Sequence, residues 1–545
     1  MDNRLDAHRV AIPRLHLNKN LTMRRRSFFA SLGLVASALS TRNASALPSN
    51  MARVDATSPA PDPTDAVRTS RHYLERIAAL DRQGPELRSI IELNPDALQI
   101  AAALDAERAA GTLRGPLHGM PVVVKDNIAT GDRMATTAGS LALDGVRASR
   151  DAHVIERLRA AGGVILGKTN LSEWANIRSS RSTSGWSGRG GLSRNPYALD
   201  RSTSGSSSGS AAAVAANLTR MAIGTETDGS IVSPSSIMGV VGLKPTVGRI
   251  SRDGIIPISH TQDTPGPIAR TVSDAALLLA ALAGPDPRDP ATLGAPAPDD
   301  YLAALNTNAL HGARIGVARE FFTGHDEIDE RIEYALAKLV LLGAELVDPI
   351  NLPKVSYENE EQAVLLHEFK HDLPVWLATF APHAPIRTLA DLIAFNDTHR
   401  EREMPYFGQE LLTQAQALGG LDSDAYVQAL AACRKGSRDE GIDRALREHR
   451  LDAIVAPTGG TTWLTDFING DSGGDGFSTP AAVAGYPHLT VPAGLVRGLP
   501  VGLSFVGPAW SEARLLALGY AFEQATQWRE EPRFIKQSSM PPIRV

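Results

Sequence analysis

The sequence has one cysteine, little net charge and no long hydrophobic run, and each absence narrows what the chain can be. Cys433 is the only cysteine among 545 residues, so no intramolecular disulfide can form. It lies in the segment AACRKGSR, which has no catalytic cysteine pattern, and we expect it on a helix. The formal net charge is −5, without a basic stripe or a long run of one sign. Nucleic acid and anionic membranes are therefore not expected as partners.

The apolar run near the N-terminus, residues 28–39, is too short to cross a bilayer, which needs about 20 residues. Arg25-Arg26 precedes this run and a small-x-small cleavage site ends at Ala46. We therefore predict that residues 1–46 are an N-terminal extension containing a twin-arginine signal peptide, cleaved after Ala46, with Met23 as a second candidate start. Such a leader predicts a periplasmic or secreted protein that folds before export, which agrees with the missing disulfide.

The composition of the whole chain is that of a globular enzyme, with 43% hydrophobic and 21% charged residues. Residues 47–64, rich in Pro, Ser and Asp, are predicted to be a linker, residues 65–535 the folded domain and residues 536–545 a tail. Short apolar runs predict buried strands at 120–124, 163–167, 313–317 and 453–455. Helical spacing predicts two or three helices within 64–110 and others at 153–161, 211–216, 270–282, 329–342, 357–379 and 511–527. This alternation predicts an α/β fold with a mixed sheet.

Three segments supply the groups that amide hydrolysis needs: VVVKDNI at 122–128, SGSSSGSAAA at 204–213 and GTETDGSIVSP at 224–234. The reaction requires a nucleophile, a base and donors for an oxyanion. Ser230 follows a turn in which consecutive N–H groups can form an anion-binding nest. Lys125 can act as a base only when neutral, and burial would lower its pKa. Because hydroxyls both accept and donate, a relay from Lys125 through Ser206 to Ser230 is chemically consistent.

The first serine-rich loop has other interpretations. A flexible linker is disfavoured because the loop lies between apolar segments and runs into an alanine-rich helix. A phosphate-binding loop would end in G-x-x-x-x-G-K-[ST], which is absent. Residues 205–209 do match the G-x-S-x-G nucleophile elbow, but that motif follows a hydrophobic strand. The preceding residues here, RNPYALDRSTS, are polar and turn-like.

A second motif, H-E-x-x-H at 367–371, suggests a zinc-dependent hydrolase that uses His367, Glu368 and His371. Zinc would need a third ligand, and the extended form of the motif is absent. Pro374 is also expected to disturb the helix that carries both histidines. This zinc enzyme and a non-catalytic binding protein are the competing hypotheses from other functional classes.

Six motifs in one order make the chain resemble the amidase signature family from roughly residue 66 to 530. They are GPLHGMPVVVKDNI (115–128), GKTNLSEWANIRSS (167–180), SGSSSGSAAAVAA (204–216), GTETDGSIVSP (224–234), VGLKPTVGRIS (241–251) and PVGLSFVGPAWSEARLLALGYAFEQAT (500–526). The resemblance implies a single α/β domain, a large twisted mixed sheet surrounded by helices. A segment like EFK-x-DL is common in the family, so it also implies that the H-E-x-x-H match is accidental.

The resemblance assigns roles residue by residue. It places the catalytic base at Lys125 and the nucleophile at Ser230. It places the bridging serine at Ser206, which follows a cis Gly205–Ser206 peptide bond. The oxyanion donors are then backbone N–H groups of Thr227, Asp228, Gly229 and Ser230. The resemblance implies no metal and no organic cofactor.

The nucleophile loop departs from the usual D-x-G-G-S-I-R, with Glu226, Asp228 and Val232 at changed positions. We expect Asp228, and with it Ser207, to contact the substrate. This variant and the leader most resemble the exported peptide amidases, which release ammonia from C-terminal peptide amides. A general aryl or aliphatic amidase is the alternative within the family, whereas the family's tRNA-dependent amidotransferases are cytosolic and work with partner proteins. The expected partner is a small-molecule or peptide amide, and the sequence carries no signal of oligomeric state.

Overall fold

The computed structural model describes residues 64–353, 357–473 and 476–537. The predicted leader and all but the last residue of the predicted linker lie outside the described residues, as does most of the predicted tail. The linker, the cleavage site and the domain boundaries therefore stay predictions. Cys433 is buried on a helix, as predicted.

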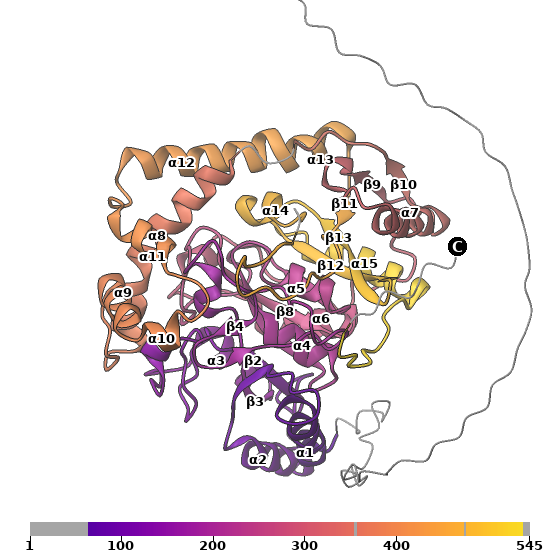
Figure 1. The fold of residues 1–545 in the computed structure, drawn as a ribbon. Coiled ribbons are helices and arrows are strands. Elements are labelled where there is room, and N and C mark those ends of the chain that lie inside the picture. The colour runs from indigo at the N-terminus through magenta and orange to yellow at the C-terminus, as the bar shows by residue number, and fades with distance from the viewer. Residues whose placement is uncertain (1–63, 354–356, 474–475, 538–545) are drawn as a thin grey trace, which may run out of the picture. The chain divides into compact units, whose positions relative to one another are not determined.

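A mixed sheet of eleven strands forms the centre of the described domain, in the order β1-β3-β2-β6-β8-β7-β12-β13-β11-β9-β10 (Figure 1). The strands are β1 (Ile90–Leu93), β2 (Pro121–Lys125), β3 (Val164–Thr169), β6 (Met221–Glu226), β7 (Val241–Lys244), β8 (Thr264–Ala269), β9 (Arg314–Val317), β10 (Glu345–Val347), β11 (Ala453–Pro457), β12 (His488–Val496) and β13 (Leu499–Val506). A separate hairpin pairs β4 (Trp186–Ser187) with β5 (Gly191–Leu192). The predicted fold class is confirmed.

Helices surround this sheet. They are α1 (Ala66–Arg76), α2 (Ala97–Ala109), α3 (His153–Ala160), α4 (Ser208–Ala215), α5 (Val232–Ile237), α6 (Val272–Leu282), α7 (Asp326–Leu341), α8 (Glu358–Phe380), α9 (Leu389–Thr398), α10 (Arg400–Glu403), α11 (Glu410–Ala417), α12 (Asp424–Arg434), α13 (Asp443–His449), α14 (Thr479–Ala484) and α15 (Glu512–Thr526). Helix α8 packs against α11 and α12, which are orange in Figure 1. No helix in the described ranges is both long and apolar enough to span a membrane.

The central strands are buried on both faces, which explains their uninterrupted apolar runs. In β2, Val122 and Val124 belong to one hydrophobic cluster with residues of α3, α6 and α15, whereas Val123 belongs to a second cluster with residues of α1, α2 and α4. Side chains alternate across a strand, so a run of three valines supplies both clusters. Apolar residues on both faces therefore fix the position of this strand and of Lys125 at its end.

Strands β2 and β6 are parallel neighbours, with Val124 opposite Ile223. Their carboxyl ends therefore reach the same edge of the sheet, where Lys125 and Glu226 are the last strand residues. Helix α4 packs against both strands, and α5 follows β6 after a short loop. The topology thus brings the three predicted active-site segments together at one edge.

The helix that presents Ser206 can pack this closely because Gly209 has no side chain. A Cβ at Gly209 would collide with the carbonyl oxygens of Ser89 and Asn170, and the latter already accepts a hydrogen bond from Gly209 N at 3.0 Å. We predict that Gly209→Ala lowers the free energy of unfolding by about 1–3 kcal/mol, measured by denaturant titration. Gly294→Ala, where a Cβ meets nothing within 4 Å, is the matched control. Equal stability of the two variants would contradict this packing account.

Candidate active site

The ammonium group of Lys125 is fully buried and contacts only neutral oxygens. Its Nζ donates to Ser206 Oγ at 2.8 Å, to Thr225 Oγ1 at 2.9 Å and to the Thr225 carbonyl at 3.2 Å. In the described part of the chain no carboxylate forms an ion pair with it. Burial lowers the pKa of Lys125 to about 7, while the more distant charges of Asp263 and Glu226 oppose this shift. Lys125 is therefore partly neutral at physiological pH.

Ser206 lies between Lys125 and Ser230. The Gly205–Ser206 peptide is cis, as the resemblance implies. Ser206 Oγ is 3.0 Å from Ser230 Oγ, and the Ser230 carbonyl accepts a hydrogen bond from the N–H of Ser207 at 3.1 Å. Lys125 and Ser206 are 0% exposed and Ser230 is 7% exposed, so Ser230 is the most accessible member of the row.

Residues 227–230 form a loop between β6 and α5, and its backbone N–H groups have no hydrogen-bond acceptor among the described residues. The N–H groups just beyond it are paired, because Glu226 Oε2 accepts from Ile231 N at 2.7 Å and from Val232 N at 3.0 Å. Gly229 has φ +74°, a conformation that favours glycine. Four consecutive donors beside the Ser230 hydroxyl can bind the oxyanion of a tetrahedral intermediate.

Side chains fix this loop from outside. Thr227 Oγ1 donates to Asp263 Oδ1 at 2.6 Å, and the other oxygen of Asp263 accepts from the N–H groups of Ile258 and Ser259. Burial raises the pKa of Asp263 to about 6. Thr479 Oγ1, at the start of α14, donates to Asp228 Oδ2 at 2.6 Å. Asp228, whose carboxylate is predicted to bind substrate, therefore also connects the loop to the start of α14.

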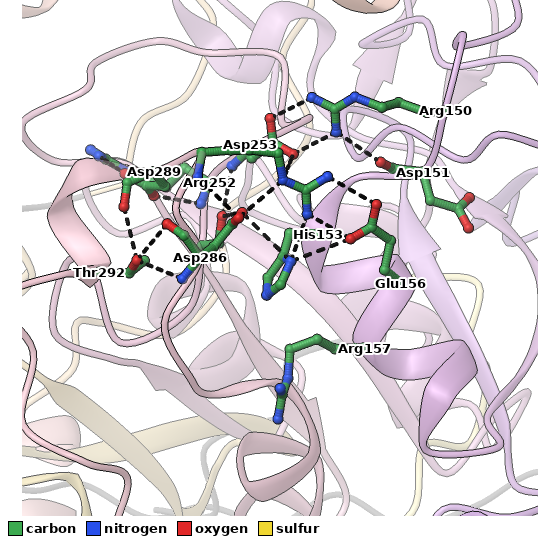
Figure 2. A network of polar contacts seen from close by, with 12 residues as sticks. Arg150, Asp151, His153, Glu156, Arg157, Arg252, Asp253, Asp286, Asp289 and Thr292 are labelled. Carbon is green, nitrogen blue, oxygen red and sulfur yellow. Dashed lines mark hydrogen bonds and ion pairs between the residues drawn. The ribbon is translucent and has the colours of Figure 1, made fainter.

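The segment that carries Asp263 is itself attached to the domain by a charged network (Figure 2). Arg150 makes two hydrogen bonds to Asp253 at 2.6 and 2.8 Å, and Arg252 binds Asp289. Arg288 binds Glu156 on α3 at 2.6 Å. Single exposed ion pairs contribute little, but several charges that share partners hold a segment in place more effectively.

A cavity of about 310 Å³ adjoins the loop. Asn176, Ser204, Gly205, Asp228, Gly229 and Trp463 are among its lining residues. Its volume is at the lower end of the range for small-molecule sites. A substrate in this cavity would lie beside the predicted oxyanion donors.

Ser207, predicted to contact the substrate, is instead buried away from this cavity. Its hydroxyl donates to the Thr225 carbonyl at 3.0 Å and accepts from Thr225 N at 3.2 Å. Both polar functions of the side chain are thus used to fix β6, and the geometry gives no support to a substrate contact. Thr225 was not predicted as a site residue, although it lies within the motif GTETDGSIVSP and its hydroxyl accepts hydrogen bonds from both Lys125 and Asn127.

The H-E-x-x-H residues do not converge on a common point. His367 Nδ1 contacts the Ala363 carbonyl at 2.7 Å, whereas His371 Nδ1 contacts Asp372 at 2.7 Å. Glu368 accepts from Ser259 and Tyr426. Among the described residues, no group of three or more His, Cys, Asp or Glu side chains is arranged to hold a metal. The geometry therefore does not favour the zinc hypothesis.

The expected disturbance of this helix by Pro374 was wrong, because α8 continues through Pro374 to Phe380. Proline removes only one backbone donor from the helix. Its neighbours Leu373, Trp376 and Leu377 are buried, so tertiary packing compensates for the lost hydrogen bond.

Comparisons with known proteins identify the family. The profile of the Amidase family matches residues 68–516. The chain is 42% identical over 475 residues to a probable amidase from Arabidopsis thaliana, covering 85% of this chain and 87% of that protein. It is 38% identical over 470 residues to a glutamyl-tRNA(Gln) amidotransferase chain from Halorhodospira halophila, covering 84% and 93%. The solved peptide amidase from Stenotrophomonas maltophilia is 54% identical, with a TM-score of 0.83 over 86% of this chain and 95% of that one.

The family match extends over most of the chain and includes β2, β6 and both serine-rich loops. The chain therefore belongs to the amidase signature family and is an enzyme that hydrolyses amide C–N bonds.

Proposed function

We propose that this amidase removes ammonia from the C-terminal amide of peptides through an acyl-enzyme on Ser230. The observation that carries the proposal is the row of contacts from Lys125 Nζ to Ser206 Oγ and on to Ser230 Oγ, at 2.8 and 3.0 Å. A buried amine with a pKa of about 7 can accept a proton near neutral pH, and two hydroxyls can pass that proton along.

In the first step, Ser230 Oγ forms a bond to the carboxamide carbon. Its proton passes to Ser206 as the proton of Ser206 passes to neutral Lys125, since hydroxyl hydrogens can rotate to serve either direction. The carbonyl oxygen becomes an oxyanion and accepts hydrogen bonds from N–H groups of residues 227–230. Such donors stabilise the charge that develops in the transition state.

In the second step, the C–N bond breaks and the nitrogen receives a proton through Ser206 from protonated Lys125. Ammonia leaves, and the acyl group remains as an ester on Ser230. Water then attacks this ester, with Lys125 and Ser206 again accepting its proton. The peptide leaves with a free carboxylate, and the enzyme returns to its starting protonation state.

The choice of a peptide amide rests on two observations. The solved relative that is 54% identical over 86% of this chain is a peptide amidase. The cavity beside the loop is lined by hydroxyl, amide and carboxylate side chains, which suit the N–H and C=O groups of a peptide better than a purely apolar substrate. We also propose export by the twin-arginine route, which rests on the leader motif alone and places the reaction in the periplasm or outside the cell.

Replacing the proposed nucleophile or base should abolish turnover. Ser230→Ala and Lys125→Met are each expected to lower kcat for ammonia release from a peptide amide by more than about 10³-fold, because each removes a group that reacts. Circular dichroism should report an unchanged fold, and Ser149→Ala, at an exposed serine, is the control. Near-normal hydrolysis by either variant would rule out the mechanism.

The pH profile should follow the protonation of Lys125. Only its neutral form accepts a proton, so kcat/KM is expected to rise with pH through about 7. The negative charge of Asp263 raises the pKa of Lys125, so Asp263→Asn should move this rise to lower pH. Asp397→Asn, at an exposed carboxylate on α9, is the control and should leave the midpoint unchanged. A midpoint that moves upward in Asp263→Asn would contradict the assignment.

A further inference from the structure

Glu361, in the first turn of α8, connects the helical layer to the nucleophile loop. Its side chain is buried, with 7% exposure. Gln262 Nε2 donates to Glu361 Oε1 at 2.9 Å and lies 3.4 Å from the Thr227 carbonyl oxygen. One amide group therefore bridges Glu361 and the backbone of the loop.

The carboxyl groups of Glu361 and Asp228 are also close enough to interact electrostatically. Two neighbouring buried carboxyl groups cannot both ionise readily, so one of them keeps a proton. Burial, and then the charge of Asp228, raise the pKa of Glu361 well above its ordinary value. Burial also raises the pKa of Asp228, but Ser478, Thr479 and the positive charge of Lys244 favour its ionised form. These causes favour the ionised form of Asp228 and the protonated form of Glu361.

The other titratable groups that face this pair fit the same assignment. Three titratable groups lie around Glu361: Glu358, Tyr357 and Cys433. The negative charge of Glu358 disfavours the ionised form of Glu361. Glu226 and Lys244 face Asp228, and they carry opposite charges. No cation among these neighbours pairs with Glu361 itself.

We propose that Glu361 is a positioning residue for amide hydrolysis: as a neutral acid it donates to Asp228, accepts from Gln262, and thereby orients residues 227 and 228 of the oxyanion loop. The proposal rests on the function proposed above, because the loop matters only if it binds the oxyanion. Glu361 does not touch the reacting atoms and acts through the two residues that it contacts.

Peptide geometry explains why these contacts matter. The Thr227 carbonyl and the Asp228 N–H belong to one planar unit and point in opposite directions. A donor on the carbonyl therefore sets the direction of the N–H, which has no acceptor of its own in the described chain. A displacement of about 1 Å can cost about 10²-fold in rate, so the outer support of the loop is a kinetic requirement.

The test compares Glu361→Gln with Glu361→Ala. Glutamine keeps both functions of a protonated glutamate, since its Oε1 can accept from Gln262 and its Nε2 can donate to Asp228. We expect Glu361→Gln to keep kcat within about 3-fold of the wild type, whereas Glu361→Ala should lower kcat about 10- to 100-fold with a much smaller change in KM. Glu360→Gln, one residue earlier on α8, is the control.

The pH profile separates positioning from mere packing. At alkaline pH the wild type should lose kcat as Glu361 ionises beside Asp228, and Glu361→Gln should lack this loss because it cannot ionise. Wild-type kcat in Glu361→Ala, or an equal loss of kcat in Glu361→Gln and Glu361→Ala, would overturn the proposal.

Infrared difference spectroscopy tests the neutral acid without turnover. At neutral pH, the spectrum of the wild type minus that of Glu361→Gln should contain the C=O band of a protonated carboxyl group. The absence of this band would overturn the proposal whatever the kinetics. If the wild type released no ammonia from any amide, the proposed function would fail, and this band would still decide the protonation of Glu361.

Discussion

The active site depends on one buried amine that has hydroxyl partners in place of a carboxylate. Lys168, on the neighbouring strand β3, is equally buried but lies 3.8 Å from Asp126. Lys125 contacts Ser206 and Thr225, so desolvation acts on it without a close counter-charge. This arrangement brings a lysine into the pH range where it can accept protons. The buried strand β2 and the close approach of α4 are the structural conditions for it.

A second constraint acts on the loop of residues 227–230, which lies on the other side of Ser206 from Lys125. Its four N–H groups must stay unpaired to be useful, so only its carbonyl groups are available for backbone hydrogen bonds. Side chains from three distant segments add further support: Asp263 and Gln262 before β8, Thr479 at α14, and Glu361 at α8. Helix α8 lies more than 100 residues beyond the loop in the sequence, so the fold brings this support together from distant parts of the chain.

The sequence predicted the elements with strong local signals, including β2, β3, α4, α6 and α15, and it indicated Lys125, Ser206 and Ser230 through motifs. It did not predict β6, β12 or β13 as strands, because their pairing is long-range and leaves no period in the sequence. Ser207 was assigned to the substrate because adjacency along a loop does not reveal which way a side chain points. Glu361 was missed for a similar reason, since a glutamate in an ordinary helix carries no local sign of a distant partner.

The central claim is that Ser230, and not the more conspicuous Ser206, carries the acyl group. Rapid quenching of the enzyme with a peptide amide, followed by proteolysis and mass spectrometry, locates the acyl adduct directly. Our account predicts an ester on Ser230 that is absent from Ser230→Ala. An adduct on Ser206, or ammonia release with no adduct on the chain under any quench time, would contradict it.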